Sequence, residues 1–246
     1  MFVKIGRDAR DALSFLLRDG LIFDAIITDP PYDTHHANTR PAVKRSSGRK
    51  VVLPFCVMPP EECAKIICEY ASILKSGGDV YVFANWRAML RMSPVLASTY
   101  ALRSIVIWDK GVPGLGHYWR NQAEFVLYAT LGKKPRGPQG NRFSYFPSNI
   151  IRFQGMKSKK PFTKPWRLYY ELLKPTISRG MKVIDLFAGS CPLGPAADRL
   201  GAVAYCVDVD FEWPRNHFRL GTSRRHSHPR DEAHANHGFT PPIDLP

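Results

Sequence analysis

The stretch Ile26-Ile27-Thr28-Asp29-Pro30-Pro31-Tyr32 closes a short apolar run and determines how the chain folds around it. The run from Phe23 to Ile27 is typical of a buried strand, which must end at two prolines that donate nothing to a sheet. The rigid turn that follows presents the Asp29 carboxylate, the Pro30 carbonyl and the Tyr32 ring together. Two acceptor oxygens suit the hydrogens of one NH2 group, and a ring can stack on the plane that carries it. The turn is therefore a candidate site for a flipped nucleobase with an exocyclic amine; an ordinary strand exit is the alternative.

Length and composition predict one soluble domain. The 246 residues suffice for one sizeable α/β core, and 44% hydrophobic and 23% charged residues are ordinary for a globular protein. No apolar run approaches the roughly 20 residues that span a bilayer, and the N-terminus does not resemble a signal peptide. We therefore expect a cytoplasmic protein without a membrane partner. The cysteines form no C-x-x-C pair, so we predict reduced thiols and no metal site; they are Cys56, Cys63, Cys68, Cys191 and Cys206.

The net charge of +14 is concentrated in two segments. Residues 131–167 contain ten Lys or Arg and no acid, and residues 33–55 contain five bases and one acid. Charge of one sign predicts a surface that binds a polyanion such as a nucleic acid, whereas an ordinary solvated surface would mix both signs. Aromatic residues interleaved with the bases of the first segment suit base stacking beside phosphate contacts. The candidate nucleic-acid contacts are Arg40, Lys44, Arg45, Lys133, Lys134, Arg136, Arg142, Lys157, Lys159 and Lys160.

Alternating strand and helix patterns predict an α/β fold. A helix from Pro60 carries an apolar stripe to Leu74 and is expected to stop at Gly77-Gly78. Residues 33–53 have no apolar period, so they predict a basic loop that could close over the turn at Asp29. Residues 222–246 predict a disordered tail. Strands are expected at 2–5, 23–28, 79–84, 104–108, 124–129, 181–187 and 203–207, and further helices at 8–19, 86–96, 166–173 and 192–200.

A second candidate site follows the strand at 181–187. A turn of small residues leads into a helix and then into a strand that ends at Asp208, which lies 23 positions after Asp185. Such an acid commonly binds ribose hydroxyls at about this spacing, and Gly189 allows a ligand to approach the backbone closely. The unit therefore predicts a nucleotide-like cofactor; an ordinary βαβ crossover is the alternative.

Together, Asp29-Pro30-Pro31-Tyr32 and Asp185-Leu186-Phe187-Ala188-Gly189-Ser190 resemble the amino-methyltransferases of DNA. The D-P-P-Y tetrapeptide precedes the cofactor turn, which is similar to the permuted order of the β class. Residues 160–165 are similar to the H-P-T-Q-K-P segment of that family, and 74–78, 108–111 and 118–124 to its other motifs. The likeness covers roughly residues 1–220. Two positions depart from the pattern: the second glycine of F-x-G-S-G is Cys191, followed by Pro192, and the His and Thr of the later segment are Lys160 and Phe162.

The resemblance implies a Rossmann-like methyltransferase fold: a doubly wound, mixed and mostly parallel seven-stranded sheet with circularly permuted motifs. The methyltransferase domain would cover residues 1–221, with a basic target-recognition insertion at about 131–160. The implied cofactor is S-adenosylmethionine. The residues expected at the reacting amine are Asp29, Pro30, Pro31 and Tyr32. Those expected at the cofactor are Asp29, Lys164, Asp185, Phe187, Gly189, Ser190 and Asp208.

The activity that this resemblance implies is methylation of adenine N6 in double-stranded DNA, with the base flipped out of the helix. Adenine is favoured because cytosine N4 members more often carry Ser in place of Asp29. A short, cationic insertion favours phosphate affinity over base discrimination, so we expect a short recognition sequence. The resemblance also implies a bacterial or phage enzyme, of the kind found in restriction–modification systems, that forms a homodimer. The alternatives are cytosine N4, RNA or protein-amide methylation, and a DNA-binding homologue with an impaired cofactor site.

Overall fold

The computed structural model describes most of the chain. The described residues are 1–32, 42–44, 50–52, 58–114, 118–132, 147–153, 164–209, 211 and 220–221, with the backbone alone at 42–44, 50–52 and 220–221. The proposed tail and most of the basic insertion therefore lie outside the described residues. No helix in the described part of the chain is long and apolar enough to cross a membrane.

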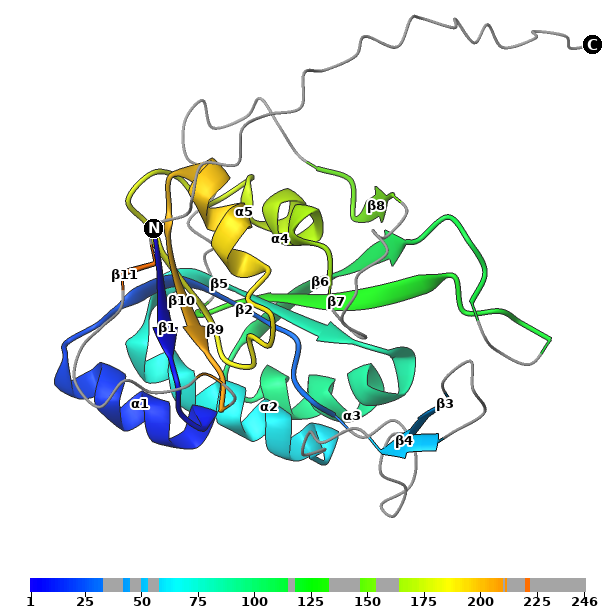
Figure 1. The fold of residues 1–246 in the computed structure, drawn as a ribbon, viewed down its shortest axis with the longest axis horizontal. Coiled ribbons are helices and arrows are strands. Elements are labelled where there is room, and N and C mark those ends of the chain that lie inside the picture. The colour runs from blue at the N-terminus through cyan, green and yellow to red at the C-terminus, as the bar shows by residue number, and fades with distance from the viewer. Residues whose placement is uncertain are drawn as a thin grey trace, which may run out of the picture.

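One large sheet forms the centre of the fold, with helices on both faces (Figure 1). Among the described residues it has nine strands, which are, in spatial order, β11 (Leu220–Gly221), β1 (Phe2–Ile5), β10 (Val203–Val207), β9 (Lys182–Asp185), β2 (Phe23–Thr28), β5 (Leu74–Ala84), β7 (Ala123–Thr130), β6 (Ala101–Asp109) and β8 (Ile150–Arg152).

The predicted seven-stranded, mostly parallel sheet is confirmed. The seven strands from β1 to β6 in this order are the seven that the sequence predicts, and β7 alone among them runs antiparallel to its neighbours. The short strands β8 and β11 extend the two edges. Parallel neighbours with crossover helices on both faces require strands that are buried on both sides, and all six residues of β2 are buried.

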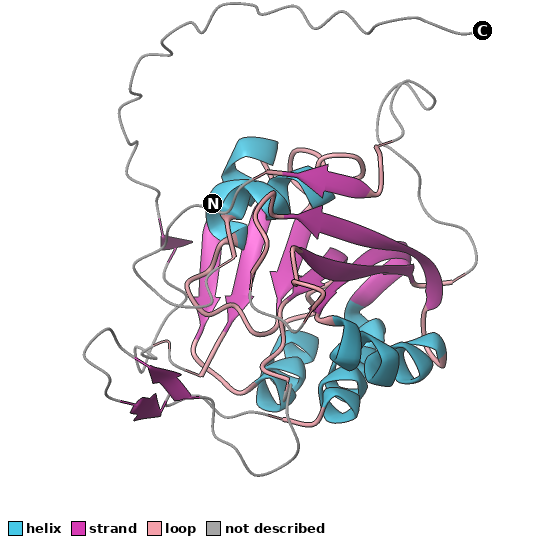
Figure 2. Ribbon diagram, turned by 90° about the vertical axis from the view of Figure 1, so that its right-hand side faces the viewer, coloured by secondary structure: helices cyan, strands magenta, loops and turns pink. Residues whose placement is uncertain are grey.

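The helices divide between the two faces, as the view along the sheet in Figure 2 shows. In the part of the chain that the structure describes, three helices pack on one face with a core built around Phe23, Ile67 and Tyr70. Two pack on the other with a core built around Phe83, Tyr169 and Val183. The first three are α1 (Ala9–Arg18), α2 (Pro60–Glu69) with the 3₁₀ turn η1 (Tyr70–Ile73), and α3 (Trp86–Ala97); the other two are α4 (Trp166–Leu173) and α5 (Leu193–Leu200).

Two predictions of local structure are wrong. The glycine pair at 77–78 does not end a helix, because β5 already begins at Leu74, where it pairs with Phe23 of β2. The register shifts between that pair and Ala25–Asp79, so the glycines form an irregularity inside the strand. Residues 33–53 are not entirely loop: β3 (Ala42–Lys44) and β4 (Lys50–Val52) pair as a small antiparallel hairpin. In both places strand pairing overrides the local sequence signal.

Candidate active site

The two candidate turns lie at neighbouring strand ends. Strands β2 and β9 pair in parallel, so Asp29 and Leu186 follow them at the same edge of the sheet. The helix after β2 in the sequence, α2, packs on one face, whereas α5, which follows β9, packs on the other. This is the switch point of a doubly wound sheet, where ligands bind beyond the carboxyl ends of the strands.

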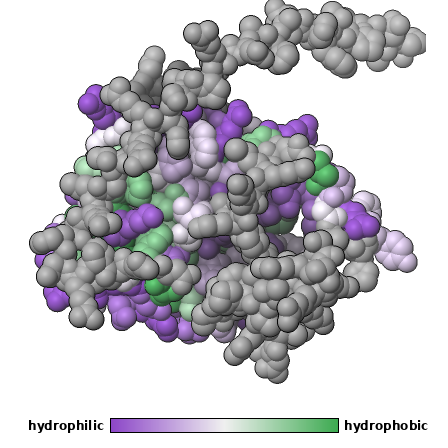
Figure 3. Space-filling model, in the orientation of Figure 1, coloured by the Kyte–Doolittle hydropathy of each residue, from purple (hydrophilic) through white to green (hydrophobic). Residues whose placement is uncertain are grey.

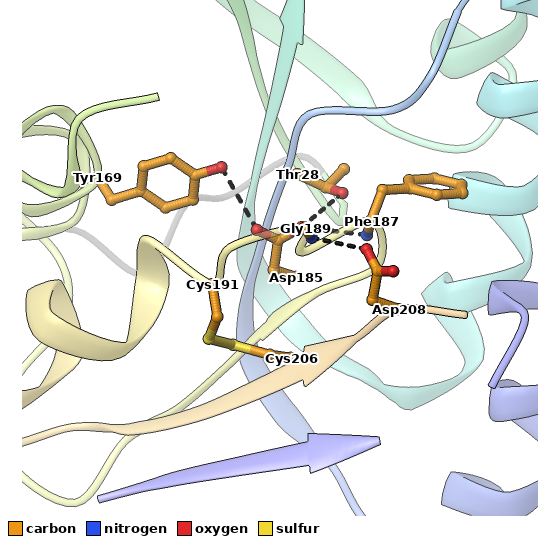
Figure 4. Close-up of a disulfide and its surroundings, with 8 residues drawn as sticks. All are labelled: Thr28, Tyr169, Asp185, Phe187, Gly189, Cys191, Cys206 and Asp208. Carbon is orange, nitrogen blue, oxygen red and sulfur yellow. Dashed lines mark hydrogen bonds between the residues drawn. A yellow bond between two sulfur atoms is a disulfide. The ribbon is translucent and has the colours of Figure 1, made fainter. Parts of the chain in front are cut away.

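The turn after β9 is held by backbone hydrogen bonds to β10. The Ala188 N–H donates to the Val207 carbonyl at 2.9 Å, and the Gly189 N–H donates to the Asp208 carboxylate at 2.6 Å (Figure 4). Gly189 has a φ of 51°, and no atom beyond its own chain neighbours lies within 4 Å of the position that a Cβ would take. Gly189 and Asp208, which the sequence pattern associates, thus lie in direct contact, and the exposed backbone at 189–190 leaves room for a ligand.

Asp185 lies beneath this turn, not on its open side. Its fully buried carboxylate accepts hydrogen bonds from the Thr28 hydroxyl at 2.9 Å, the Phe187 N–H at 3.2 Å and the Tyr169 hydroxyl at 3.3 Å. Burial raises the pKa of Asp185 to about 7, although these donors oppose the rise. Asp185 therefore ties β9 to β2 and α4, and it positions Phe187 rather than facing the open end (Figure 4).

Cys191 forms a disulfide with Cys206 on β10, so the prediction of reduced thiols is wrong for this pair. Cys191 has a φ of 59°, in the left-handed region where a non-glycine residue costs about 1–2 kcal/mol. That conformation explains a glycine at this position in the resembling family. It also directs the buried Cys191 side chain toward β10, away from the exposed backbone of residues 189–190. Cys63 and Cys68 are free thiols, and Cys56 lies outside the described residues.

The turn after β2 is fixed at three points. The Tyr32 N–H donates to the Pro30 carbonyl at 2.9 Å, and the Met58 N–H donates to the Pro31 carbonyl at 2.9 Å. The Tyr32 hydroxyl accepts a hydrogen bond from the Asn85 N–H at 3.0 Å, just beyond the end of β5. A carbonyl oxygen has two lone pairs, so Pro30 retains one acceptor position. The turn thus holds Asp29, Pro30 and Tyr32 in one rigid group.

Charged side chains from distant parts of the sequence surround Asp29. The Lys164 ammonium lies 2.8 Å from Asp29 Oδ2 and 3.2 Å from Glu124 Oε2, and Lys110 Nζ lies 3.2 Å from Glu124 Oε1. Lys164, whose side chain is 15% exposed, therefore bridges two carboxylates. The family resemblance assigned Lys164 to the carboxylate of a cofactor, but in this structure its partners are Asp29 and Glu124.

The pKa values of these groups shift with burial and with one another. Burial raises the pKa of Asp29, while Lys164 opposes that rise and Glu124 adds to it. Burial also raises the pKa of Glu124, but Lys164 and Lys110 outweigh it and the net shift is downward. Burial lowers the pKa of Lys164, yet the two carboxylates reverse this effect and the net shift is upward. Lys164 is thus held as a cation beside Asp29.

Five residues of this site were not found as site residues from the sequence: Thr28, Asn85, Lys110, Glu124 and Tyr169. Glu124 lies in the family-like motif at residues 118–124, to which the sequence analysis assigned no role. Its pairing with Lys164 depends on the fold. No group of three or more metal-binding side chains is present among the described residues. The structure describes none of the side chains that are candidate nucleic-acid contacts. Lys44 is described only as backbone in β3, and the others lie outside the described residues: Arg40, Arg45, Lys133, Lys134, Arg136, Arg142, Lys157, Lys159 and Lys160.

Comparison with solved structures identifies the fold. The structure of M1.HpyAVI in complex with SAM matches with a TM-score of 0.66 at 19% identity, covering 86% of this chain and 94% of that one. The chain has the methyltransferase fold. PvuII DNA methyltransferase, described as cytosine-N4-specific, matches with a TM-score of 0.58 at 15% identity, covering 85% and 82%. A putative DNA modification methylase from Thermus thermophilus, TTHA0409, matches with a TM-score of 0.58 at 19% identity, covering 84% and 88%. No family model and no curated protein sequence matches the chain.

Proposed function

We propose that this protein transfers a methyl group from S-adenosylmethionine to the exocyclic N6 amine of adenine in DNA. The observation that carries the proposal is the hydrogen bond at 2.9 Å between Thr28 and Asp185. It joins the strand end that presents Asp29 to the strand end that carries the glycine turn. A group that orients an amine thus lies beside a turn suited to a nucleoside cofactor, at the switch point of the sheet.

The residues after β9 fit the cofactor. Gly189 offers bare backbone with open space above it, and the half-buried Asp208 carboxylate lies beside it, where a ribose would bind. The buried Cys191 side chain does not fill this space. Phe187 and Ser190 complete the turn on either side of Gly189. When bound, the cofactor supplies an electrophilic methyl group; complexes with SAM or S-adenosyl-L-methionine occur among the solved structures of similar fold.

Asp29 and Pro30 orient the target amine. An NH2 group conjugated to a base ring is a poor nucleophile, because its lone pair is delocalised. When the Asp29 carboxylate and the Pro30 carbonyl accept its two hydrogens, the nitrogen is favoured in a pyramidal form whose lone pair points away from the ring. The Tyr32 ring, fixed through Asn85, stacks on the flipped base.

Lys164 favours the ionised, accepting form of Asp29. Burial alone would favour the protonated acid, which donates a hydrogen bond instead of accepting one. The ammonium at 2.8 Å counteracts this effect from the side of Oδ2. The raised pKa of Asp29 also makes its oxygen a better acceptor for the proton that the amine loses.

The assignment of adenine as the substrate depends on Asp29, because the cytosine enzymes of the family that the sequence resembles more often carry Ser at this position. Cytosine N4 is the second candidate, favoured by the likeness to the cytosine-N4-specific PvuII enzyme. RNA methylation and a DNA-binding homologue with an impaired cofactor site, suggested by Cys191 and Pro192, are the remaining alternatives. We further propose an intracellular homodimer, of the kind that serves restriction–modification, acting on duplex DNA at a short sequence through the cationic segments.

Tritium transfer from labelled S-adenosylmethionine to duplex DNA, RNA and protein tests the proposal. We expect label in duplex DNA, recovered as N6-methyladenine after digestion to nucleosides. Label recovered in N4-methylcytosine or in RNA would show that cytosine or RNA, and not adenine in DNA, is the substrate. Calorimetry that shows no binding of S-adenosylmethionine would support the impaired homologue. A panel of methylation-sensitive restriction enzymes tests the short sequence: protection confined to one site of six or more bases would contradict it.

A further inference from the structure

Two aromatic side chains project into solvent between β6 and β7. Tyr118 is 98% exposed and Trp119 is 92% exposed, which makes them the most exposed large apolar side chains among the described residues. The connection lies at the right-hand edge of the molecule in Figures 1 and 3. Large rings gain stability by burial, so two adjacent rings held in water suggest that a partner covers them.

The base of this connection is firmly held. Asp109, at the end of β6, accepts hydrogen bonds from the Gly111 N–H at 2.8 Å, Gln122 Nε2 at 2.7 Å and Arg152 Nε at 2.7 Å. The Gly114 N–H donates to the Asn121 carbonyl at 3.2 Å. These donors lower the pKa of Asp109 to about 2, so it remains charged. The rings are therefore presented on a supported hairpin.

The hairpin leaves the sheet at the edge that carries Asp29. Strand β7 begins beside the end of β5, where Ala84 pairs with Phe125. Glu124, the second residue of β7, contacts Lys164, which contacts Asp29. Only a few residues separate the exposed rings from the network around Asp29.

The charge of the hairpin suits a nucleic acid. No acid occurs between Asp109 and Glu124 in the sequence, and Arg120, which follows the two rings directly, is exposed. Exposed aromatic rings beside a cation suit base stacking together with a phosphate contact. A flipped base leaves a gap in the helix that a flat ring can fill, which reduces the cost of unstacking.

We propose that Tyr118 and Trp119 form a stacking wedge that contacts duplex DNA beside the flipped base. This inference rests on the proposed function, because a wedge can fill a gap in the helix only if a base is flipped out of a duplex. A single strand offers no gap to fill, so the wedge acts on duplex substrates alone.

The test compares Trp119→Ala, Tyr118→Ala and the double variant with Trp119→Phe, which retains a ring. Leu17→Ala changes a half-exposed apolar side chain on α1 and serves as the control. Stacking contributes about fivefold to one-hundredfold in affinity per ring, so Trp119→Ala should raise the KM for duplex DNA about tenfold or more. The KM for single-stranded DNA should change less than about twofold, and Trp119→Phe should stay close to wild type. Binding of duplex DNA is measured in parallel by fluorescence anisotropy.

The proposal is overturned if the double variant binds and methylates duplex DNA as the wild type does. It is also overturned if the variants weaken self-association in sedimentation and leave duplex binding unchanged, because the rings would then serve a second copy of the chain. Absence of methyl transfer in the wild type would refute the proposed function instead. In that case the anisotropy measurements still test whether the two rings contact duplex DNA. The wedge proposal is then retained only if Trp119→Ala weakens the binding of duplex DNA.

Discussion

The turn after β2 and the turn after β9 lie at neighbouring strand ends, but different forces hold them. The first carries a mostly buried carboxylate held by Lys164, and Glu124 and Lys110 continue the chain of charges. The second is held by backbone hydrogen bonds, by the buried Asp185 and by the disulfide at Cys191. A charged network can rearrange when a ligand brings new partners, whereas covalent and buried bonds keep one geometry. The first turn therefore combines a fixed backbone with charged side chains that can exchange partners, whereas the second is held by covalent and buried bonds.

The largest expected effect comes from removing the carboxylate. Asp29→Ala should lower methyl transfer about a thousandfold, because the target amine loses its charged acceptor and Lys164 loses a partner. Binding of duplex DNA should persist in anisotropy measurements, since Tyr32 and the cationic segments remain. Asp11→Ala, an exposed acid on α1, is the matched control. Transfer within tenfold of wild type in Asp29→Ala would remove Asp29 from the mechanism.

Breaking the disulfide tests the rigid turn. A cross-link over 15 positions stabilises a fold by roughly 3 kcal/mol in the chain-entropy estimate. Reductant should therefore lower the free energy of unfolding of the wild type by about that amount and weaken S-adenosylmethionine binding, as measured by urea titration and calorimetry. Cys206→Ser should be insensitive to reductant, whereas Cys68→Ser should respond like the wild type. Equal stability of the wild type with and without reductant would show that the cross-link does not hold this turn.

Neutralising Glu124 tests the charged turn. Glu124 raises the pKa of Asp29, so Glu124→Gln should lower that pKa and move the acid limb of the kcat/KM profile to lower pH. The side chains of Lys164 and Glu124 are 15% and 32% exposed, and an ion pair near the surface contributes on the order of 1 kcal/mol, so the loss in kcat/KM should be about tenfold or less. Glu171→Gln removes an ion pair with Lys174 on α4 and should leave the profile unchanged. An acid limb that moves to higher pH in Glu124→Gln would contradict the network.

The smallest effect at pH 5 is expected at Asp185. Its pKa is about 7 in the fold, above the ordinary 3.8, so the folded state holds a proton that the unfolded state has lost between these values. Stability should therefore fall as the pH rises from about 4 to about 7, and Asp185→Asn should remove this slope. The amide can accept from Thr28 and Phe187 and donate to the Tyr169 hydroxyl, so at pH 5 stability should change by less than about 1 kcal/mol.

Urea unfolding at pH 5 and pH 8 measures both quantities, with Asp11→Asn as the exposed control. A pH slope that persists in Asp185→Asn would assign the proton to another group.

Local signals made the strand ends predictable from the sequence. The prolines at 30 and 31 must end a strand, and the 23 positions from Asp185 to Asp208 are the spacing of one βαβ unit. The seven long strands follow from apolar runs because both faces of the sheet are buried. Such features depend on residues close together in the chain.

Features that depend on the fold were not predictable in the same way. Glu124 and Lys164 meet only because β7 and the start of α4 converge at the edge that carries Asp29. The pairing of Cys191 with Cys206 requires the turn after β9 to fold back over β10 and a left-handed backbone at Cys191. Leu74 joins β5 because Phe23 offers it a partner, against the local helical pattern. In each case the deciding partner is distant in sequence.

The most direct test of the central claim is modified-base sequencing of DNA from cells that express the wild type or Asp29→Ala, in a host without its own DNA methyltransferases. The account predicts N6-methyladenine at a short sequence in the wild-type culture and none in the variant culture. Unmodified DNA in both cultures, with the wild-type protein folded and abundant, would contradict it.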